Sequence, residues 1–491
     1  MSETSTSAAE GPDEAASPRA RLLHDLDVDI CVVGAGLAGL TVAREAARLG
    51  ASVAVLEGRH VGWNASGHQL GTVMPGFNLP VSGLIERVGL EDARELWALS
   101  NEGAEYVRGI ATAGLIPDIG FSEGALEVPN VDAGEALIRR VQTLGEEFGA
   151  DVEGWHVDRV RSVLKTGRYF HGIHYPKAFQ IDGRKYVHGL AALATRVGAR
   201  IFEDTPVVSI DFSGIRKRIA TPSARLRASH IVLAGNVHLG APLERLSETL
   251  LPVWRYAALT EPLGERLADA IAFQGSVIDS DGIDHFRIVE GDRLLWASPE
   301  TTWPAQSTRF ARGVQRRIET VFPQLGKVPI AETFGGAVGV TVHGMPQIGQ
   351  LRKGLWVASG FGRQGLNTSA MAGQLIARSI LWGDERWRLF SPFELVWAGG
   401  AIGRVAGQVI GMWARGASSA AGVFARYRES VRAKERIRED RLTKANLRAG
   451  TRAPSRRGRL PVAPRAFGVR ERADAHPVPS QESERVPDDS M

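Results

Sequence analysis

The chain has 491 residues, of which 44% are hydrophobic and 23% are charged, and its formal net charge is +4. This composition excludes a mainly disordered or fibrous protein and leaves ample apolar material for a large core. The single cysteine, Cys31, excludes an intramolecular disulfide, a Cys-based zinc site and an iron–sulfur cluster, which favours a reducing, cytoplasmic location.

The positive charge is concentrated near the C-terminus. Residues 426–470 contain 15 Lys and Arg but 4 Asp and Glu, whereas residues 471–491 contain 2 and 6. Such a basic run suits nucleic acid or anionic lipid, but we expect a solvated helix followed by a disordered tail, and no nucleic-acid partner. Residues 1–26 start with a polar, Ser- and Ala-rich stretch, which predicts a disordered leader without a signal-peptide pattern.

The body begins with a βαβ unit over residues 28–57. The apolar run from Ile30 to Val33 predicts a buried parallel strand, which a glycine-rich turn and an Ala-rich helix follow. Gly50 ends that helix, and Val53 to Leu56 predicts a second buried strand.

Later elements change from helical to antiparallel patterns and back. Helices are predicted over residues 84–113, 132–149, 184–198 and 305–321. Residues 199–211 predict two strands and residues 230–236 another. Residues 250–300 alternate like antiparallel strands around a turn at Gly291-Asp292. Residues 354–381 then predict a strand, a glycine-rich turn and a long helix.

The turn after the first strand matches the pattern G-x-G-x-x-G with the residues Gly34-Ala35-Gly36-Leu37-Ala38-Gly39. The first glycine permits the tight turn, the second lets the backbone approach a pyrophosphate, and the third lets helix and strand pack closely. The helix N-terminus offers N–H groups to the phosphates. Glu57 ends the second strand, where a ribose-binding carboxylate is expected. These features predict a bound dinucleotide but do not separate NAD from FAD.

The segment that follows Glu57 carries a resemblance to a known family. Its sequence GWNASGHQLGTVMPG (62–76) resembles the second FAD motif of the D-amino-acid-oxidase-like flavoproteins, and is most similar to the γ-glutamylputrescine oxidase and glycine oxidase branches. Further matches recur in family order from about residue 28 to 385: GRKYVHGLA, ARIFEDTPVVSI, IVLAGN, LTEPL, GMPQIG and GLWVASGFGRQGLNTSAMAG.

The resemblance implies an α/β, Rossmann-like FAD-binding domain interleaved with an α+β substrate domain that is built on an antiparallel sheet. We assign residues 27–80, 185–245 and 330–385 to the FAD-binding domain, and residues 81–184 and 246–329 to the substrate domain. Residues 386–445 would form a helical extension and residues 446–491 a disordered tail.

The resemblance also implies the cofactor contacts. Residues 65–67 would wrap the pyrophosphate, residues 207–208 would touch the adenine, and residues 360–366 would cover the isoalloxazine, with a helix N-terminus near Asn367. The expected FAD-binding residues are Gly34, Gly36, Leu37, Ala38, Gly39, Glu57, Ala65, Ser66, Gly67, Val207, Val208, Ala234, Gly235, Gly360, Phe361, Gly362, Gln364, Gly365 and Leu366. Asn64 stands where relatives with covalent flavin have a His, and no Cys lies near the C-terminal motif, so noncovalent FAD is expected.

Arg363 is the main candidate for substrate binding. The string from Arg363 to Leu366 resembles the Arg-Asn-Gly-Ile of glycine oxidase, in which the Arg binds the substrate carboxylate, and a planar guanidinium suits that task. His68 stands where the family has an Arg, and could tune charge or transfer a proton. Residues 297–300 stand after the predicted DRLL strand, where the family usually has a Gly-Gly pair. A structural role is the alternative for Arg363 and His68.

Other candidates are weaker. Trp254 and Arg287 lie on the predicted antiparallel sheet and could touch substrate, or belong to the core or surface. His171 and His174 are assigned to a loop without acidic partners, so no metal site is expected. Cys31 is expected to be an inert core thiol.

Residues 393–413 form an apolar segment interrupted by Glu394, Arg404 and Gln408, so we do not expect it to span a membrane. On a helix, residues 402, 405, 409 and 412 share one face, and glycines at 399, 403, 407 and 411 form a small-residue stripe. We expect this helix to pack on the body. A subunit interface or peripheral membrane contact through residues 393–445 is the alternative.

We therefore expect an FAD-dependent oxidoreductase that oxidises a C–N bond of a small amine or amino acid and passes electrons to O₂. A dehydrogenase that passes them to a membrane quinone or another acceptor is one alternative, and a flavin-binding scaffold without turnover is another. A nicotinamide-dependent dehydrogenase would require the later motifs to be accidental.

Overall fold

The structure is a computed structural model that describes residues 19–239, 243–280, 284–297, 299–304 and 307–450. Most of the predicted leader and tail lies outside these residues. The chain divides into two units, Met1–Ser430 and Val431–Met491. The elements that position the candidate site belong to the first.

The first sheet has a parallel core in the order β17-β10-β1-β2-β7, with β16 antiparallel at the edge beside β17 and with β9 and β8 attached to β10. Its strands are β1 (Leu26–Val33), β2 (Val53–Leu56), β7 (Arg200–Phe202), β8 (Ser209–Asp211), β9 (Lys217–Ala220), β10 (Arg225–Leu233), β16 (Gln347–Arg352) and β17 (Leu355–Ser359).

The sheet is buried on both faces, which explains the continuous apolar runs of its strands. Along β1, Ile30 and Val32 join one core cluster while Cys31 joins another. The first cluster lies under the helices α1 (Leu37–Arg48), α5 (Gly183–Arg196) and α8 (Gly365–Trp382). Burial raises the pKa of the Cys31 thiol, as expected for an inert core residue.

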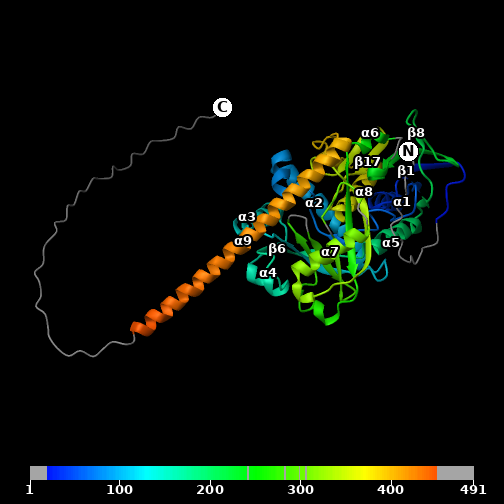
Figure 1. Cartoon of the computed structure of the whole chain (residues 1–491). Helices are drawn as coiled ribbons and strands as arrows, with labels where there is room; N and C mark the ends of the chain where they lie inside the picture. Colours follow the sequence, from blue (N-terminus) through cyan, green and yellow to red (C-terminus); the bar gives the residue numbers. More distant parts are fainter. Residues whose placement is uncertain (1–18, 240–242, 281–283, 298, 305–306, 451–491) are drawn as a thin grey trace, which may run out of the picture. The chain divides into compact units, whose positions relative to one another are not determined.

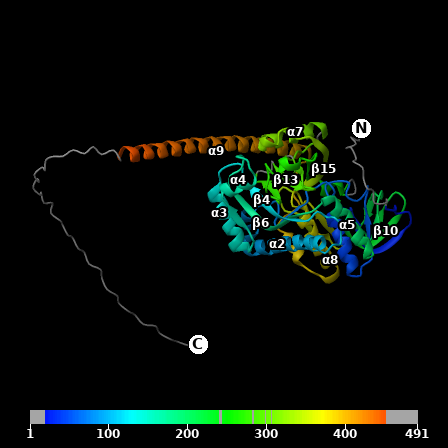
Figure 2. The same cartoon turned by 90° about the horizontal axis from the view of Figure 1, so that it is seen from below.

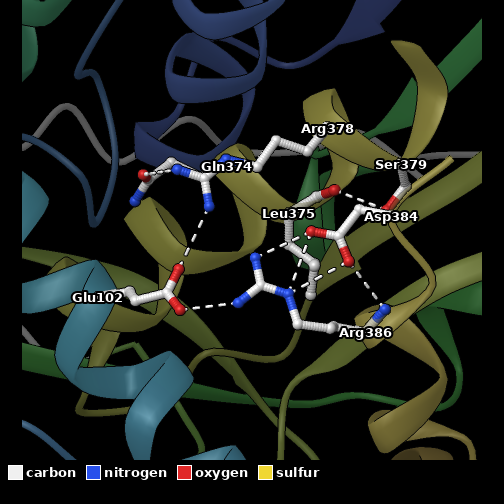
Figure 3. Close-up of polar contacts among 7 residues, drawn as sticks. All are labelled: Glu102, Gln374, Leu375, Arg378, Ser379, Asp384 and Arg386. Carbon is white, nitrogen blue, oxygen red and sulfur yellow. Dashed lines mark hydrogen bonds and ion pairs between the residues drawn. The ribbon is translucent and has the colours of Figure 1, made fainter. Parts of the chain in front are cut away.

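The helix α2 (Val81–Thr112) packs against α8 and closes this cluster (Figure 1). It is kinked at Gly89, where φ is 80°. Near the crossing, Glu102 of α2 pairs with Arg378 of α8 and with Arg386 of the short helix η6 (Arg386–Phe390), and Arg386 also pairs with Asp384 (Figure 3). This network ties the segment after α8 back to α2.

The second sheet has the order β15-β11-β14-β13-β12-β4-β6-β3, with β5 beside β6, and is antiparallel except for the β12–β4 pair. Its strands are β3 (Thr72–Val73), β4 (Ser122–Val128), β5 (Glu153–Trp155), β6 (Gly172–Gln180), β11 (Leu251–Thr260), β12 (Ser276–Asp279), β13 (His285–Val289), β14 (Arg293–Ala297) and β15 (Ile330–Val340). The predicted turn at Gly291-Asp292 joins β13 to β14.

Side chains alternate between the two faces of this sheet. Phe286 and Trp296 stack in a core cluster with the helix α7 (Ser307–Val321), which covers the outer face (Figure 2). Ala257 and Leu295 face the opposite side, where Leu70 packs against them. The remaining short helices are α3 (Gly134–Gln142), which continues into a π-helical turn at Thr143–Glu147, α4 (Val157–Val163), α6 (Glu244–Ser247), η2 (Asn236–His238), η4 (Gly264–Leu267) and η5 (Pro323–Leu325).

The expected two-part α/β and α+β architecture is confirmed, with differences in detail. Residues 330–340, at the start of a range assigned to the dinucleotide domain, form β15 of the second sheet. Residues 19–26 of the predicted leader are ordered, because Leu22 is buried and Arg19 pairs with Glu203. His174 lies on β6 rather than in a loop.

The C-terminal helix α9 (Gly400–Gly450) begins near α6 and passes α4 (Figures 1 and 2). Its contacts within the first unit are polar. The Thr302 backbone N–H donates to Gln408 at 2.9 Å, and Arg161 of α4 forms a two-pronged ion pair with Glu429. Across the described residues, no helix has the length and apolar character needed to cross a membrane.

Replacing Gly103 by Ala should lower the free energy of unfolding by about 1–3 kcal/mol, because the added Cβ would lie 2.1 Å from the Asn367 carbonyl oxygen of α8. Gly109 of the same helix is the matched control. Its Cβ meets nothing within 4 Å, so Gly109→Ala should stabilise the protein by up to about 1 kcal/mol. Urea unfolding followed by circular dichroism measures both. Equal effects of the two substitutions would contradict the close crossing of α2 and α8.

Candidate active site

The turn between β1 and α1 leaves no room for side chains. Gly34 has φ 105°, and a Cβ there would stand 2.9 Å from the backbone of Ala234 and Gly235. A Cβ on Gly39 would lie 2.1 Å from the Gly34 carbonyl oxygen. The two glycines therefore let β1, α1 and the end of β10 meet, and Ala234 and Gly235, which are predicted to line the cofactor, lie next to Gly34.

The N-terminus of α1 is open to an anion. Within the described residues, no side chain caps this helix at Gly36, and Leu37, Ala38 and Gly39 supply no acidic group to its first turn. The N–H groups of a first helical turn have no intrahelical acceptors, and the helix dipole makes them attractive to phosphate. The structure thus has a helix N-terminus without acidic residues in its first turn at the position where the sequence predicts phosphate binding.

Glu57 lies beside this turn at the end of β2 and is 7% exposed. Its Oε2 accepts a hydrogen bond from the Ala35 backbone N–H at 2.8 Å. Its Oε1 accepts from the backbone N–H of Arg59 and from the indole N–H of Trp63. A buried carboxylate fixed in this way is the acceptor that a ribose hydroxyl requires.

The loop of residues 62–71 lies between the first turn of α1 and the inner face of the second sheet. Ser66 Oγ accepts from the Leu37 backbone N–H at 3.3 Å. On the other side, Asn64 makes paired bonds to the backbone N–H and C=O of Ala337 in β15. A Cβ at Gly336 would lie 2.5 Å from the Ala65 nitrogen, so β15 and this loop are in close contact. Ala65, Ser66 and Gly67 are thus placed next to the phosphate-binding helix.

Asn64 also donates to His238 Nε2 at 2.8 Å. Burial, and then the charge of Arg59, lower the pKa of His238 to about 4, so its ring is neutral and accepts this bond. The sequence analysis did not predict that Asn64 would join η2, β15 and the loop.

Val207 and Val208, the expected adenine contacts, precede β8 at the far side of the first sheet. The Val208 backbone N–H donates to the Ala220 carbonyl at 2.8 Å, and its side chain is exposed. Val207 packs against the core cluster that contains Cys31.

The loop between β17 and α8 contains the predicted isoalloxazine contacts, residues 360–366. Asn78 fixes it by donating to the Phe361 carbonyl at 2.9 Å and accepting from the Arg363 backbone N–H at 2.9 Å. Gly362, with φ 55°, could not carry a side chain, because its Cβ would lie 2.2 Å from Asn78 Nδ2. The helix α8 begins at Gly365, close to the predicted N-terminus at Asn367, and its first turn has no acidic residue.

The alternation of the second sheet decides which polar residues face the 62–71 loop. Arg255 of β11 and His285 and Arg287 of β13 lie on the same side as Ala257 and Leu295. Arg287 donates to the Ile181 carbonyl at 3.0 Å and lies close to Gly71. Trp254 alternates to the opposite side and so does not join this cluster. Burial lowers the pKa of Arg287 to about 10, although Asp182 opposes the shift.

A directed chain of partly buried hydrogen bonds starts at Arg255. Arg255 Nη2 lies 2.7 Å from His285 Nδ1, and His285 Nε2 lies 2.9 Å from Thr72 Oγ1. Burial and then Arg255, Arg287 and Arg363 hold the pKa of His285 well below its usual range, so the ring is neutral. A guanidinium only donates, hence Nδ1 accepts and Nε2 carries the proton that bonds Thr72.

The chain continues through Thr72 to Ser276 Oγ at 2.6 Å and from Ser276 to Gln180 Oε1 at 3.1 Å. Each hydroxyl accepts a hydrogen bond from the preceding residue and donates one to the next, so the direction of the chain is set by Arg255. The chain fixes the orientation of a buried guanidinium, which is the condition for binding an anion in one geometry. Burial lowers the pKa of Arg255 to about 10, Glu300 opposes the shift and Arg363 adds to it.

Arg363 points toward Glu300, which follows β14. Nε and Nη2 lie 2.7 and 3.1 Å from the two carboxylate oxygens of Glu300, and 46% of the Arg363 side chain is exposed. The charge of Glu300 raises the pKa of Arg363 against the effect of burial. The predicted carboxylate-binding fork of Arg363 therefore holds a carboxylate of the chain itself.

His68, in the 62–71 loop, lies with its ring centre 5.9 Å from that of Phe334 in β15. His171 and His174 each face one carboxylate, Asp132 at 3.7 Å and Glu153 at 3.3 Å, which corrects the expectation that they have no acidic partners. In the described part of the chain, no three or more His, Cys, Asp or Glu residues gather as a metal site would require.

A dinucleotide cradle on a parallel sheet, facing a polar wall on an antiparallel sheet, defines a two-domain dinucleotide-dependent oxidoreductase. The chain belongs to the DAO family of FAD dependent oxidoreductases, whose model matches residues 29–379. It is therefore an enzyme of a family that acts on C–N groups, and the cradle has the residues that FAD binding needs.

Named relatives agree with this assignment. The chain is 28% identical over 377 residues to the probable oxidoreductase OrdL of Haemophilus influenzae, covering 75% of this chain and 86% of that protein. It is 26% identical over 379 residues to the γ-glutamylputrescine oxidoreductase of Escherichia coli, covering 76% and 88%. The crystal structure of glycine oxidase from Bacillus cereus has the same fold, with a TM-score of 0.62 at 20% identity, covering 74% of this chain and 98% of that one.

The sequence analysis missed Asn78, Arg255, His285 and the residues that orient them. A signal for Arg255 was present, because it interrupts the apolar positions of one face of a predicted strand. The register that places Arg255 beside His285 depends on long-range pairing, which local patterns do not contain.

Replacing Glu57 by Gln should weaken FAD binding by about tenfold or more, because the amide has one acceptor oxygen where the carboxylate has two. Fluorescence titration of the apoprotein with FAD measures the dissociation constant. Unfolding of the apoprotein is the control for a general loss of structure. An unchanged FAD affinity would contradict a ribose-binding role for Glu57.

Proposed function

We propose that this protein oxidises the C–N bond of a small amine or amino acid that carries a carboxylate, using noncovalently bound FAD and passing the electrons to O₂. The observation that carries the proposal is the polar wall formed by Arg255, Arg363 and Glu300. The Glu300 carboxylate bonds Arg363 and acts on Arg255 through its charge, and a substrate carboxylate would balance the remaining positive charge.

Burial strengthens this argument. Removing a guanidinium from water is costly unless an anion compensates it, and burial lowers the pKa of Arg255 although the charge of Glu300 opposes the shift. The hydrogen bond to His285 nevertheless holds Arg255 in place. A site that keeps a buried, oriented and under-neutralised cation is suited to an anionic ligand group.

FAD would be held by the residues of the cradle: the first turn of α1 at the pyrophosphate, Glu57 at the ribose, residues 207–208 at the adenine and residues 360–366 at the isoalloxazine. When bound, FAD supplies an acceptor for the hydride of the carbon that bears the amine. The N-terminus of α8 provides positive potential next to residues 360–366, where it would stabilise negative charge.

The residues of the second sheet would bind and orient the substrate. We assign carboxylate binding to Arg255 and Arg363, and a charge-tuning role to His68 in the 62–71 loop. The two named relatives with stated substrates act on glycine and on γ-glutamylputrescine, which are both amines with a carboxylate. This supports an amine with an anionic group as the substrate class.

The absorption spectrum of the purified protein is the first experiment. Flavin bands should appear, and the flavin should pass into the supernatant after heat denaturation, because Asn64 offers no attachment point. Flavin retained by the denatured polypeptide would overturn noncovalent binding.

Anaerobic bleaching by a panel of amines then tests turnover. Bleaching by a carboxylated amine, followed by reoxidation in air with hydrogen peroxide release, supports the oxidase. Bleaching followed by reoxidation with a quinone but not with O₂ would assign a dehydrogenase. A protein that binds flavin but is bleached by none of the amines would support the scaffold.

Arg255→Met should raise KM about 10- to 100-fold for an amino acid and leave KM for its primary amide nearly unchanged, because only the acid offers an anion to the guanidinium. Steady-state kinetics with this matched pair of substrates measures the effect, and Arg255→Lys should recover part of the loss. Equal effects on acid and amide would contradict a carboxylate-binding role.

Glu300→Gln should lower KM for the same amino acid severalfold, because the amide no longer competes as a charged partner for Arg363. The bond lengths of 2.7 and 3.1 Å show that the native carboxylate occupies both prongs of the fork. A rise in KM for the acid would show that Glu300 instead attracts the cationic end of the substrate.

A further inference from the structure

The orientation of α9 is the reverse of that expected for a helix on a protein surface. Helices normally bury their apolar face and expose their polar one. Here the polar and small residues face the body: Gln408 bonds Thr302, and a Cβ at Gly407 would lie 3.1 Å from Leu251. Glu429, about one turn past the middle of the helix, continues the same contact through Arg161.

The large apolar residues of α9 face away from these contacts. Their spacing places them on one side of the helix, and we call them the α9 apolar stripe: Ile402, Val405, Val409, Met412, Trp413, Val423 and Tyr427. Their exposed fractions range from 53% for Val405 to 77% for Ile402. Leu395, Val396 and Trp397, just before the helix, are exposed as well, and the Ala398 backbone N–H bonds Glu248 to fix this segment on the body.

A contiguous apolar surface of this kind marks an interaction site. The charges around it identify the partner. Between Glu394 and Glu429 the sequence contains no Asp or Glu, but it contains four arginines, at positions 404, 415, 426 and 428. An apolar stripe flanked only by positive charge is complementary to a surface that combines hydrocarbon with anionic groups.

We propose that the α9 apolar stripe docks on an anionic lipid bilayer. The helix would lie in the plane of the membrane interface, with its apolar side chains among the acyl chains, Trp413 and Tyr427 at the headgroup level and the exposed Arg428 near lipid phosphates. The contacts to Thr302 and Arg161 would hold the catalytic body beside the bilayer. This inference does not depend on the proposed substrate or electron acceptor.

A second copy of the chain is the competing occupant. Joining two stripes would bring two sets of arginines together without acidic partners from the same stretch, which disfavours self-association. A bilayer with anionic headgroups supplies the missing negative charge.

Flotation of the full-length, FAD-loaded protein with vesicles tests the proposal. The protein should float with phosphatidylcholine vesicles that contain phosphatidylglycerol, should float far less with phosphatidylcholine alone, and should lose binding as salt rises. The triple variant Ile402→Gln, Val409→Gln and Trp413→Gln should lower the partition coefficient by about tenfold or more.

A matched variant controls for the loss of exposed apolar residues in general. Ile138, Ile215 and Trp382 are also exposed but lie outside α9, so their replacement by Gln should leave flotation unchanged. Flavin absorbance confirms that both variants are folded. A wild-type protein that does not float, a stripe variant that floats as well as the wild type, or equal flotation with neutral and anionic vesicles overturns the proposal. A wild-type dimer that the stripe variant converts to a monomer in light scattering, without vesicle binding, assigns the surface to a second copy instead.

Discussion

The close approach of β1, α1 and β10 at Gly34 and Gly39 is the constraint on which the rest of the site depends. A Cβ at position 39 would lie 2.1 Å from the Gly34 carbonyl oxygen, so any other residue there would push α1 away from the sheet. The N-terminus of α1 would then lose its aim at the pyrophosphate, and Ser66 would lose its bond to Leu37. The same loop carries Asn64, which holds β15 and so the second sheet. The close contact between Gly34 and Gly39 therefore influences how the 62–71 loop and the second sheet are placed relative to α1.

The sequence was sufficient to predict what local periodicity and motif spacing encode. The βαβ unit, the antiparallel segment around Gly291 and the helix that follows the 360–364 turn all carry such patterns. The membership of β15 in the second sheet was not predictable in this way, because residues 330–340 were grouped by order along the chain while pairing with Leu251–Thr260 decides their place. The polar chain from Arg255 through His285 to Thr72 joins three strands that lie far apart in sequence, and only the register brings them together.

The helix α9 shows a different limit of sequence reasoning. Its two faces were separable from the periodicity, but the periodicity could not say which face would meet the body. The contacts of Gln408 and Glu429 settle this, and they assign the body to the side that carries the glycines. Polar contacts hold one face of α9 on the body, and the α9 apolar stripe on the other face stays exposed.

Glu300 affects which substrates the proposed site would favour. The segment after β14 carries Glu300, and its carboxylate occupies the guanidinium fork of Arg363. In the proposed function, a substrate carboxylate that binds Arg363 would have to displace Glu300, so binding at Arg363 would depend on the difference between two ion pairs rather than on the strength of one. Arg255 provides a second guanidinium, which His285 holds in place and which the charges of Glu300 and Arg363 both affect. In the proposed function, the substrate would bind Arg255 while Glu300 keeps Arg363, and the site would favour amines whose carboxylate reaches Arg255 rather than Arg363.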